Sequence, residues 1–417
     1  MVLVAIISAI ILTFTKAKYK TTESIPLVNG TINYELSDLN LIGVYIEDGS
    51  SYTKTDQIPD SGYTLNEEKS YCKIGEEKQD TTITYDMNTK TLNIAPMTTK
   101  GTKCYLYFDE QKTLLADAIK RDNQIKSETP NFSQAATTNE GVYKTEDDWG
   151  DSYYFRGAVT NNWVSFAGFY WRIIRINGDG SIRMIYNGTS TATTGTTTMI
   201  NNGASQAFNS SYDRSEYVGY MYTSGQQHGN TTDSPIKDVV DSWYSSNLAN
   251  YSDKISKEAG FCGDRNMASG SSWSSTPSST IYYAARERLY TNKTPTLKCS
   301  NSADLYTVSG SSKGNKALTN PVGLITADEV AMAGGVYESN NSSYYLYTGQ
   351  NYWTMSPYFF NASGGKSWAR VFSVYSGGDL NFNFVNNTWS VRPVINLRSD
   401  VTISSGDGTS SNPYVIS

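Results

Sequence analysis

A hairpin signature in the middle of the chain sets the strongest limit on the fold. Two runs of alternating apolar residues flank Asn177, Gly178, Asp179 and Gly180 in YYFRGAVTNNWVSFAGFYWRIIRINGDGSIRMIYNG, at 153–188. Asn, Asp and Gly tolerate the positive φ that tight hairpin turns require, so the segment is predicted to form two antiparallel strands. A domain built around this hairpin is expected to contain an antiparallel sheet.

A second group of strand-like runs lies nearer the N-terminus. The runs LIGVYIED, TTITYD and TLNIAPM fall within 25–108 and are separated by Gly, Asp, Asn and Pro turns. This pattern is typical of a small β-sandwich. Residues 21–108 are therefore predicted to form an all-β, sandwich-like stalk domain.

The segment after this domain has a helical pattern. Leu114, Leu115 and Ile119 recur at helical spacing, and a polar, turn-rich stretch follows them. Residues 109–145 are therefore predicted to form a helical connector and linker. The chain of 417 residues is long enough for two or three domains, and 146–417 is predicted to be the large one.

The N-terminus carries an uncharged apolar run, 2–14, directly before Lys16, Lys18 and Lys20. A bilayer span needs about 20 apolar residues, so the run is short for a complete span. Residues 1–20 are predicted to be a transmembrane anchor or a signal segment. The anchor is favoured, because no small-residue cleavage site follows the run. Both interpretations place the rest of the chain outside the cytoplasm.

The four cysteines form two local pairs in the sequence. Cys72 and Cys104 lie in one strand-rich region, and Cys262 and Cys299 lie in another. No C-x-x-C spacing occurs, which argues against a zinc or thioredoxin-like site. The pairings Cys72–Cys104 and Cys262–Cys299 respect the domain division best. Two structural disulfides are therefore predicted, together with an oxidising, extracellular setting.

Composition excludes one class of partner. The residues are 13% aromatic, with 32 Tyr against 13 Phe, and only 18% are charged, for a net charge of −6. No basic cluster is present that could follow a phosphate backbone. Nucleic acid is therefore not expected as a partner, and a surface rich in tyrosine, amides and hydroxyls is.

Two helices are predicted in the large domain. In SPIKDVVDSWYSSNL, Ser234 is a natural N-cap and Pro235 suits the first helical position. In LITADEVAMAGG, Thr326 and Glu329 match a capping box. The helix dipole explains Asp328 and Glu329, so neither is assigned a catalytic role.

The order of elements in 150–417 resembles a known family. The segments WRIIRINGDGS, NPVGLITADEVAMAGG, YWTMSP and VRPVINL are similar to the C-type-lectin fold in its bacterial formylglycine-generating-enzyme-like branch. The tail also resembles uncharacterised surface proteins of gut Firmicutes and the variable proteins that retroelements diversify. The resemblance implies an α+β fold, with two helices and a mixed antiparallel sheet with hairpins. It also implies a ligand-binding surface on the C-terminal hairpins.

The residues argue against an enzyme. No cysteine follows Cys299, whereas the oxygen-dependent enzymes of the resembled family use a cysteine pair near the end of their domain. His228 is the single histidine, so no multi-histidine metal site can form, and it is expected to be a solvated loop residue. GSSKG at Ser312 matches G-x-S-x-G, but no apolar helix follows it. No catalytic residue, metal or cofactor is therefore predicted.

The candidate binding surface is the stretch GGDLNFNFVNNTW at 377–389 with its neighbours. In a strand, Leu380, Phe382 and Phe384 share one face and Asn381 and Asn383 the other. The aromatic side chains are expected mainly in the core and the amides at the surface, where Asn and Tyr suit recognition. The predicted ligand-binding residues are Tyr352, Tyr358, Phe359, Asn361, Phe372, Tyr375, Asp379, Asn381, Asn383, Asn386 and Asn387.

These features together predict a function. The chain is expected to be a membrane-anchored cell-surface protein of a Gram-positive bacterium that binds a glycan or a protein. One alternative is a formylglycine-generating-type enzyme whose catalytic residues have been replaced. The other is a structural surface-layer or pilus subunit that associates with itself through the Asn/Tyr face. The sequence does not fix the oligomeric state.

Overall fold

The computed structural model describes residues 32–33, 40–59, 62–96, 101–363 and 366–417, so the expected anchor or signal segment at 1–20 lies outside the described residues. The chain divides into two compact units, Met1–Lys112 and Thr113–Ser417. No helix in the described part of the chain is both long enough and apolar enough to cross a membrane.

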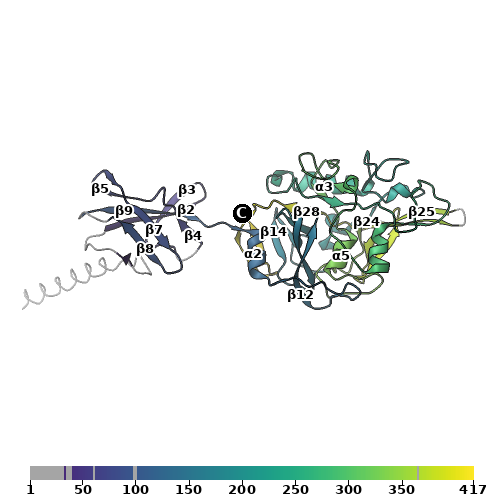
Figure 1. The fold of residues 1–417 in the computed structure, drawn as a ribbon, viewed down its shortest axis with the longest axis horizontal. Coiled ribbons are helices and arrows are strands. Elements are labelled where there is room, and N and C mark those ends of the chain that lie inside the picture. Colours follow the sequence, from purple (N-terminus) through teal and green to yellow (C-terminus); the bar gives the residue numbers. More distant parts are fainter. Residues whose placement is uncertain (1–31, 34–39, 60–61, 97–100, 364–365) are drawn as a thin grey trace, which may run out of the picture. The chain divides into compact units, whose positions relative to one another are not determined.

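Every regular element described in the small unit is a strand (Figure 1). One sheet has the order β1-β8-β7, with bounds Ile32–Asn33, Thr91–Ala95 and Thr82–Asp86. The other has the order β3-β2-β9-β5-β6, with β4 also paired to β9. Its strands are Ser51–Thr55, Asn40–Asp48, Lys103–Glu110, Tyr71–Ile74, Glu77–Gln79 and, for β4, Tyr63–Leu65.

A disulfide joins two strands inside the core of this unit. Cys72 on β5 and Cys104 on β9 are direct cross-strand partners, both fully buried, and their sulfurs are bonded. Residues of both sheets pack around them, including Leu106 of β9 and Leu92 of β8. The second predicted disulfide, Cys262–Cys299, is also present in the large unit. Two disulfides indicate an extracellular or secreted protein.

The main sheet of the large unit has 11 strands. The order β10-β29-β30-β14-β15-β13-β12-β11 comprises Thr113–Leu114, Thr402–Ser405, Tyr414–Ile416, Trp163–Phe166, Phe169–Ile176, Gly150–Gly157, Asn139–Asp147 and Ile125–Lys126. β16 (Ile182–Tyr186) pairs with β15 to form the predicted hairpin, and β28 (Val394–Leu397) joins β16 to β23 (Val322–Gly323). Because β29 follows β10 in the sheet, the two ends of this unit lie side by side.

A separate four-stranded sheet lies away from β12 and β14 in the same unit (Figure 1). Its order is β21-β24-β25-β26, formed by Ile281–Tyr282, Tyr352–Ser363, Lys366–Val374 and Leu380–Phe384. The remaining strands form three two-stranded ribbons: β17 (Gln206–Ala207) with β27 (Thr388–Trp389), β18 (Met221–Tyr222) with β19 (Thr232–Asp233), and β20 (Phe261–Cys262) with β22 (Leu305–Tyr306).

The helices of the large unit are short. They are α2 (Leu115–Asp122), α3 (Pro235–Asn247), α4 (Ala284–Arg286), which continues into a π-helical turn at Glu287–Asn292, and α5 (Ala327–Ala333). The α5 capping box is confirmed, because Thr326 and Glu329 bond each other's backbone. α5 packs against β13 of the main sheet and against β24, β25 and β26, so it connects the two sheets.

The expected α+β fold, a two-helix domain of the C-type-lectin kind, is wrong. The molecule is mostly β, with 39% strand and 15% helix, and the described residues contain four α-helices and many sheets. The physical reason is the composition. Tyr and β-branched residues favour strands, while Ser, Asn and Gly favour turns, so helical spacing persists only over short segments.

The expected connector, 109–145, belongs to the large unit from Thr113 onward. Leu115, Ala118 and Ile119 of α2 are fully buried in the core of the large unit. β11 and β12 extend its main sheet. The apolar face of α2 therefore stabilises the large unit, and this helix is not a free-standing spacer.

Candidate functional site

A row of cross-strand neighbours runs over all four strands of the second sheet. Tyr282 on β21 pairs with Phe359 on β24, Phe359 pairs with Arg370 on β25, and Arg370 pairs with Phe384 on β26. Directly paired residues point to the same side of a sheet. The register therefore lines up three aromatic rings and one guanidinium on one face.

A second group of rings lies beside this row. The register shifts between Pro357 and Phe359, which brings the adjacent rings of Tyr358 and Phe359 within 4.9 Å. Tyr358 stacks on Phe382 with the ring centroids 4.3 Å apart, and Tyr337 is parallel to Tyr358 at 5.7 Å. We call the whole cluster the aromatic face; it consists of Tyr282, Arg286, Tyr290, Tyr337, Tyr358, Phe359, Trp368, Arg370, Phe382 and Phe384.

The aromatic face is partly open to solvent. Its rings at Phe359, Phe382 and Phe384 are half-buried, as is Trp368, and Tyr290 is 44% exposed. Tyr358, with 3% exposure, forms the floor of the cluster. Part of each of these side chains therefore remains accessible to solvent above the buried Tyr358.

Arg370 lies at the centre of this face. Its guanidinium carbon is 4.1 Å from the ring centroid of Phe384, 4.6 Å from that of Phe359 and 5.1 Å from that of Phe382. Among the described residues it has no ion pair, and its buried Nε has no hydrogen-bond partner. Burial lowers the pKa of Arg370 from its ordinary value, because no carboxylate compensates the charge.

A second arginine lies at the other edge of the cluster. The guanidinium of Arg286 on α4 is 4.1 Å from the ring of Tyr282 and 4.7 Å from that of Tyr290. Its Nε also lacks a hydrogen-bond partner within the part of the chain that the structure describes. Such cation–π contacts hold a guanidinium flat on a ring and leave the outward N–H groups for a ligand.

The two faces of β26 are not covered as the sequence prediction has them. Asn383 pairs with Val371 and Asn381 with Ser373, and both of these partners are fully buried. Asn383 is 9% exposed and Asn381 half-buried, whereas Phe382 and Phe384 share the face of Arg370. The expectation that the aromatic side chains are core and the amides surface is therefore wrong. Alternation separates two faces but does not say which one is covered.

The remaining predicted residues are dispersed. Tyr358, Phe359 and Phe372 lie at the aromatic face, with Phe372 fully buried against Tyr358. The amide of Asn361 is at its edge, opposite Trp368. Tyr352 and Asp379 are buried, and Tyr375 bonds the carbonyl of Phe382. Asn386 and Asn387 are exposed in the turn after β26, where Asn387 donates to Asn383.

Sequence reasoning missed Arg370, Arg286, Trp368, Tyr282, Tyr290 and Tyr337. One signal was available in KSWARVFSV, at 366–374, where Trp368, Arg370 and Phe372 alternate. An arginine between two aromatic residues on one strand face indicates a face that is not fully buried, since unpaired buried charge is costly. Arg286 and Tyr290 reach the face through tertiary packing, which no local pattern reveals.

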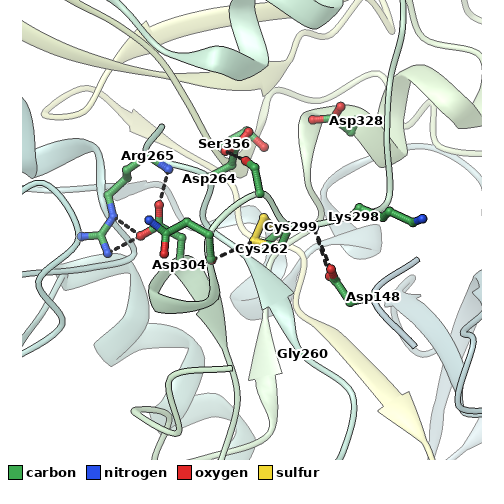
Figure 2. The surroundings of a disulfide bond; sticks show 12 residues. Asp148, Gly260, Cys262, Asp264, Arg265, Lys298, Cys299, Asp304, Asp328 and Ser356 are labelled. Atoms are coloured by element: carbon green, nitrogen blue, oxygen red, sulfur yellow. Dashed lines mark hydrogen bonds and ion pairs between the residues drawn. A yellow bond between two sulfur atoms is a disulfide. The ribbon is translucent and has the colours of Figure 1, made fainter. Parts of the chain in front are cut away.

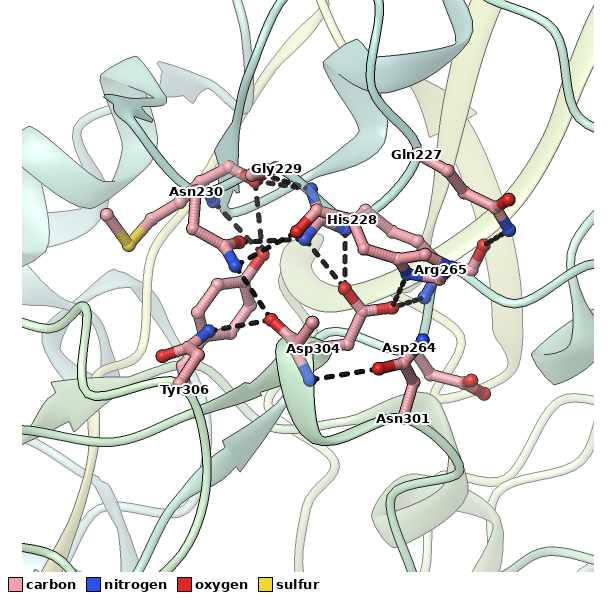
Figure 3. Close-up of polar contacts among 12 residues, drawn as sticks. Gln227, His228, Gly229, Asn230, Asp264, Arg265, Asn301, Asp304 and Tyr306 are labelled. Atoms are coloured by element: carbon pink, nitrogen blue, oxygen red, sulfur yellow. Dashed lines mark hydrogen bonds and ion pairs between the residues drawn. The ribbon is translucent and has the colours of Figure 1, made fainter.

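His228 is not the solvated residue that its loop suggested. Its Nδ1 lies 2.9 Å from Oδ2 of the buried Asp304, and Asp304 also accepts from Nε of Arg265 at 2.9 Å (Figure 3). Asn230 donates to the carbonyl of Ala303 and accepts from Arg265. The network joins three loops through buried charges. No described Ser, Thr or Cys donates to the His228 ring, so no nucleophile–base pair is formed.

A polar cavity lies beside the Cys262–Cys299 disulfide (Figure 2). Asp148 accepts from the backbone N–H of Cys299, while Arg288 pairs with Asp264 at 2.6 Å and with Asp328 at 2.9 Å. The cavity measures about 20 Å³, room for about one water molecule. The described residues contain no group of three or more His, Cys, Asp or Glu that could hold a metal ion. Paired charges and backbone hydrogen bonds therefore connect the segments around this disulfide.

The G-x-S-x-G match also lacks catalytic geometry. Ser312 donates to the carboxylate of Glu258, which accepts a second bond from Nε1 of Trp149 at 2.8 Å. A serine bonded to a carboxylate without an imidazole between them is not an activated nucleophile. Ser312 is best explained as a loop anchor.

No family model, no curated protein and no solved structure matches this chain.

Proposed function

We propose that this protein is an extracellular glycan-binding protein and that the aromatic face is its binding surface. The observation that carries the proposal is the row Tyr282–Phe359–Arg370–Phe384, in which half-exposed rings flank an unpaired guanidinium. The C–H groups of a sugar ring carry slight positive charge and stack on the negative faces of aromatic rings. A neighbouring guanidinium donates hydrogen bonds to sugar oxygens.

The exposure of the rings favours a sugar over a protein partner. A stable protein–protein interface covers about 800 Å² on each partner and centres on large anchors that enter pockets. Here Phe359, Phe382 and Phe384 are each half-buried, and Tyr358 is almost completely covered. Half-exposed single rings suit a small polar ring better than a broad apolar surface.

The proposed location is the cell surface. The disulfides support an oxidising compartment. The apolar run at 2–14 supports attachment of the chain, through its N-terminus, to the membrane of a Gram-positive cell. Binding at the aromatic face of the large unit would then serve adhesion to a glycan-bearing surface.

A glycan array tests the proposal with the full chain and three variants. Phe359→Ala with Phe384→Ala removes two rings of the row, and at least a tenfold loss of binding is expected. Tyr251→Ala is the matched control, because it removes a 41% exposed ring outside the aromatic face. Asn386→Ala with Asn387→Ala tests the exposed amides instead.

The outcomes separate the two surfaces. Retained binding in the Tyr251 and Asn386/Asn387 variants, with loss in the ring variant, supports the aromatic face. Loss only in the amide variant would move the site to the turn after β26. If no glycan binds the full chain, or all variants bind equally, the proposal is wrong.

A further inference from the structure

Arg370 differs from the other arginines of the described chain. Ten arginines each have at least one guanidinium hydrogen bond or ion pair there, and the side chain of Arg286 has a hydrogen bond with Tyr358. Even the fully buried Arg392 donates to the carbonyls of Tyr186 and Leu346. The fold therefore satisfies its structural arginines, and Arg370 is an exception.

Arg370 lies where a ligand could contact it. Arg370 is half-buried and in contact with the rings of Phe359, Phe382 and Phe384, which fix its plane. Partial burial strips water from the charge without supplying a counterion, and it lowers the pKa of Arg370. An anion that docks there would gain charge-assisted hydrogen bonds and relieve that cost.

We infer that the ligand of the aromatic face is an acidic sugar whose carboxylate pairs with Arg370. The inference rests on the proposed glycan-binding function. A planar carboxylate matches the two parallel N–H groups of a guanidinium. The exposed parts of Phe359 and Phe384 that Arg370 leaves uncovered would contact the same or the next sugar. Arg370 therefore determines specificity, while the rings supply most of the contact area.

Because the chain is acidic overall, an acidic sugar would be attracted only at short range, by Arg370 itself. The net charge is −6, so an acidic polymer is repelled by the protein as a whole and gains little from distant steering. An acidic peptide would meet the same guanidinium but has no sugar ring to stack on Phe359 and Phe384. The paired arrangement of ring and arginine thus favours a carboxylated glycan.

The test uses matched pairs of oligosaccharides with the full chain. Oligogalacturonate and hyaluronan fragments are offered with free carboxylates and as methyl esters, and 3′-sialyllactose is offered beside lactose. The wild type is expected to bind at least one acid about tenfold more tightly than its neutral partner. Arg370→Gln is expected to bring that ratio close to one, and Arg370→Lys, which keeps the charge but not the fork, to an intermediate value.

Controls keep the two claims apart. Arg398→Gln removes an equal charge from an exposed pair with Asp400 and is expected to leave the ratio unchanged. Equal binding of acids and neutral partners overturns the acidic-sugar inference but leaves glycan binding standing. An acid preference that survives in Arg370→Gln, or equal binding of dextran sulfate, also overturns it. If no oligosaccharide binds, both claims are wrong.

Discussion

Two arginines of the large unit show how differently one side chain can be used. Arg265 is 1% exposed and donates to Asp304 through Nε and Nη2, and to two backbone carbonyls through Nη1. Arg370 has no such partner among the described residues and lies on three rings at a half-open surface. The first arginine holds loops together, and the second has its donors free.

The difference between Arg265 and Arg370 distinguishes an arginine that stabilises the fold from one that is proposed to bind a ligand. A buried ion pair is destabilising to break, because removing one partner strands the other charge. A half-buried guanidinium without an ion pair contributes less to the free energy of unfolding than a buried, paired one, and the proposed ligand would account for its position. The comparison therefore predicts large stability effects at Asp304 and small ones at Arg370.

The largest effect is expected from Asp304→Asn. The substitution leaves Arg265 buried without its counter-charge, and it also weakens the contact of His228. The free energy of unfolding should fall by about 3–5 kcal/mol, as for other broken buried pairs. Chemical denaturation of the full chain measures it. A loss below about 1 kcal/mol would show that the network is not what holds these loops.

At acidic pH, the difference in the free energy of unfolding between wild type and Asp304→Asn should become smaller. Burial acts to raise the pKa of Asp304, but the hydrogen bond from His228 and the charge of Arg265 outweigh it and lower that pKa below 3.8. A lowered carboxyl pKa gives stability that is complete above the unfolded value and is lost as the pH falls through the folded value. The free energies of unfolding of the two proteins, measured from pH 6 to pH 3, should therefore begin to converge below about pH 4. A constant gap would contradict this assignment.

A smaller loss is expected from Phe382→Ala. Phe382 stacks on Tyr358 and lies beneath Arg370, but it is only half-buried. Complete burial of a Phe makes its truncation cost about 3–5 kcal/mol, so a loss of about 1–2 kcal/mol is expected here. Thermal unfolding measures it. A loss as large as that of Asp304→Asn would show that the aromatic face is ordinary core.

The smallest effect is expected from Arg370→Gln. No ion pair or hydrogen bond is broken among the described residues, and only the cation–π contacts with Phe359, Phe382 and Phe384 are lost, so stability should change by no more than about 1 kcal/mol. The same denaturation series used for Asp304→Asn measures it. A loss above about 2 kcal/mol would place Arg370 with the structural arginines and remove the contrast on which the proposal depends.

Local patterns in the sequence were enough for several elements. The turn at Asn177–Gly180 predicted the β15–β16 hairpin, and both disulfide pairings followed from the cysteine positions. The capping box at Thr326 and Glu329 located α5. Each of these features depends on residues close in sequence or on one simple pairing, so one amino-acid sequence is enough to predict it.

Predicting the aromatic face needed information that local patterns lack. Alternation along 380–384 defined two faces of β26, but which face packs inward is decided by neighbours such as Val371 and Ser373. Arg286 and Tyr290 come from α4 and the turn after it, far from β26 in sequence. The fold class predicted from the sequence is wrong for a similar reason, since the sheets are assembled from strands that are distant along the chain.

Hydroxyl-radical footprinting of the full chain, with and without the tightest oligosaccharide from the array, tests the central claim most directly. Oxidation of Trp368, Phe359 and Phe384 should fall when the sugar is bound, while oxidation of Tyr251, exposed elsewhere, should stay the same. Unchanged oxidation of these three rings, together with protection at another surface, would contradict the account.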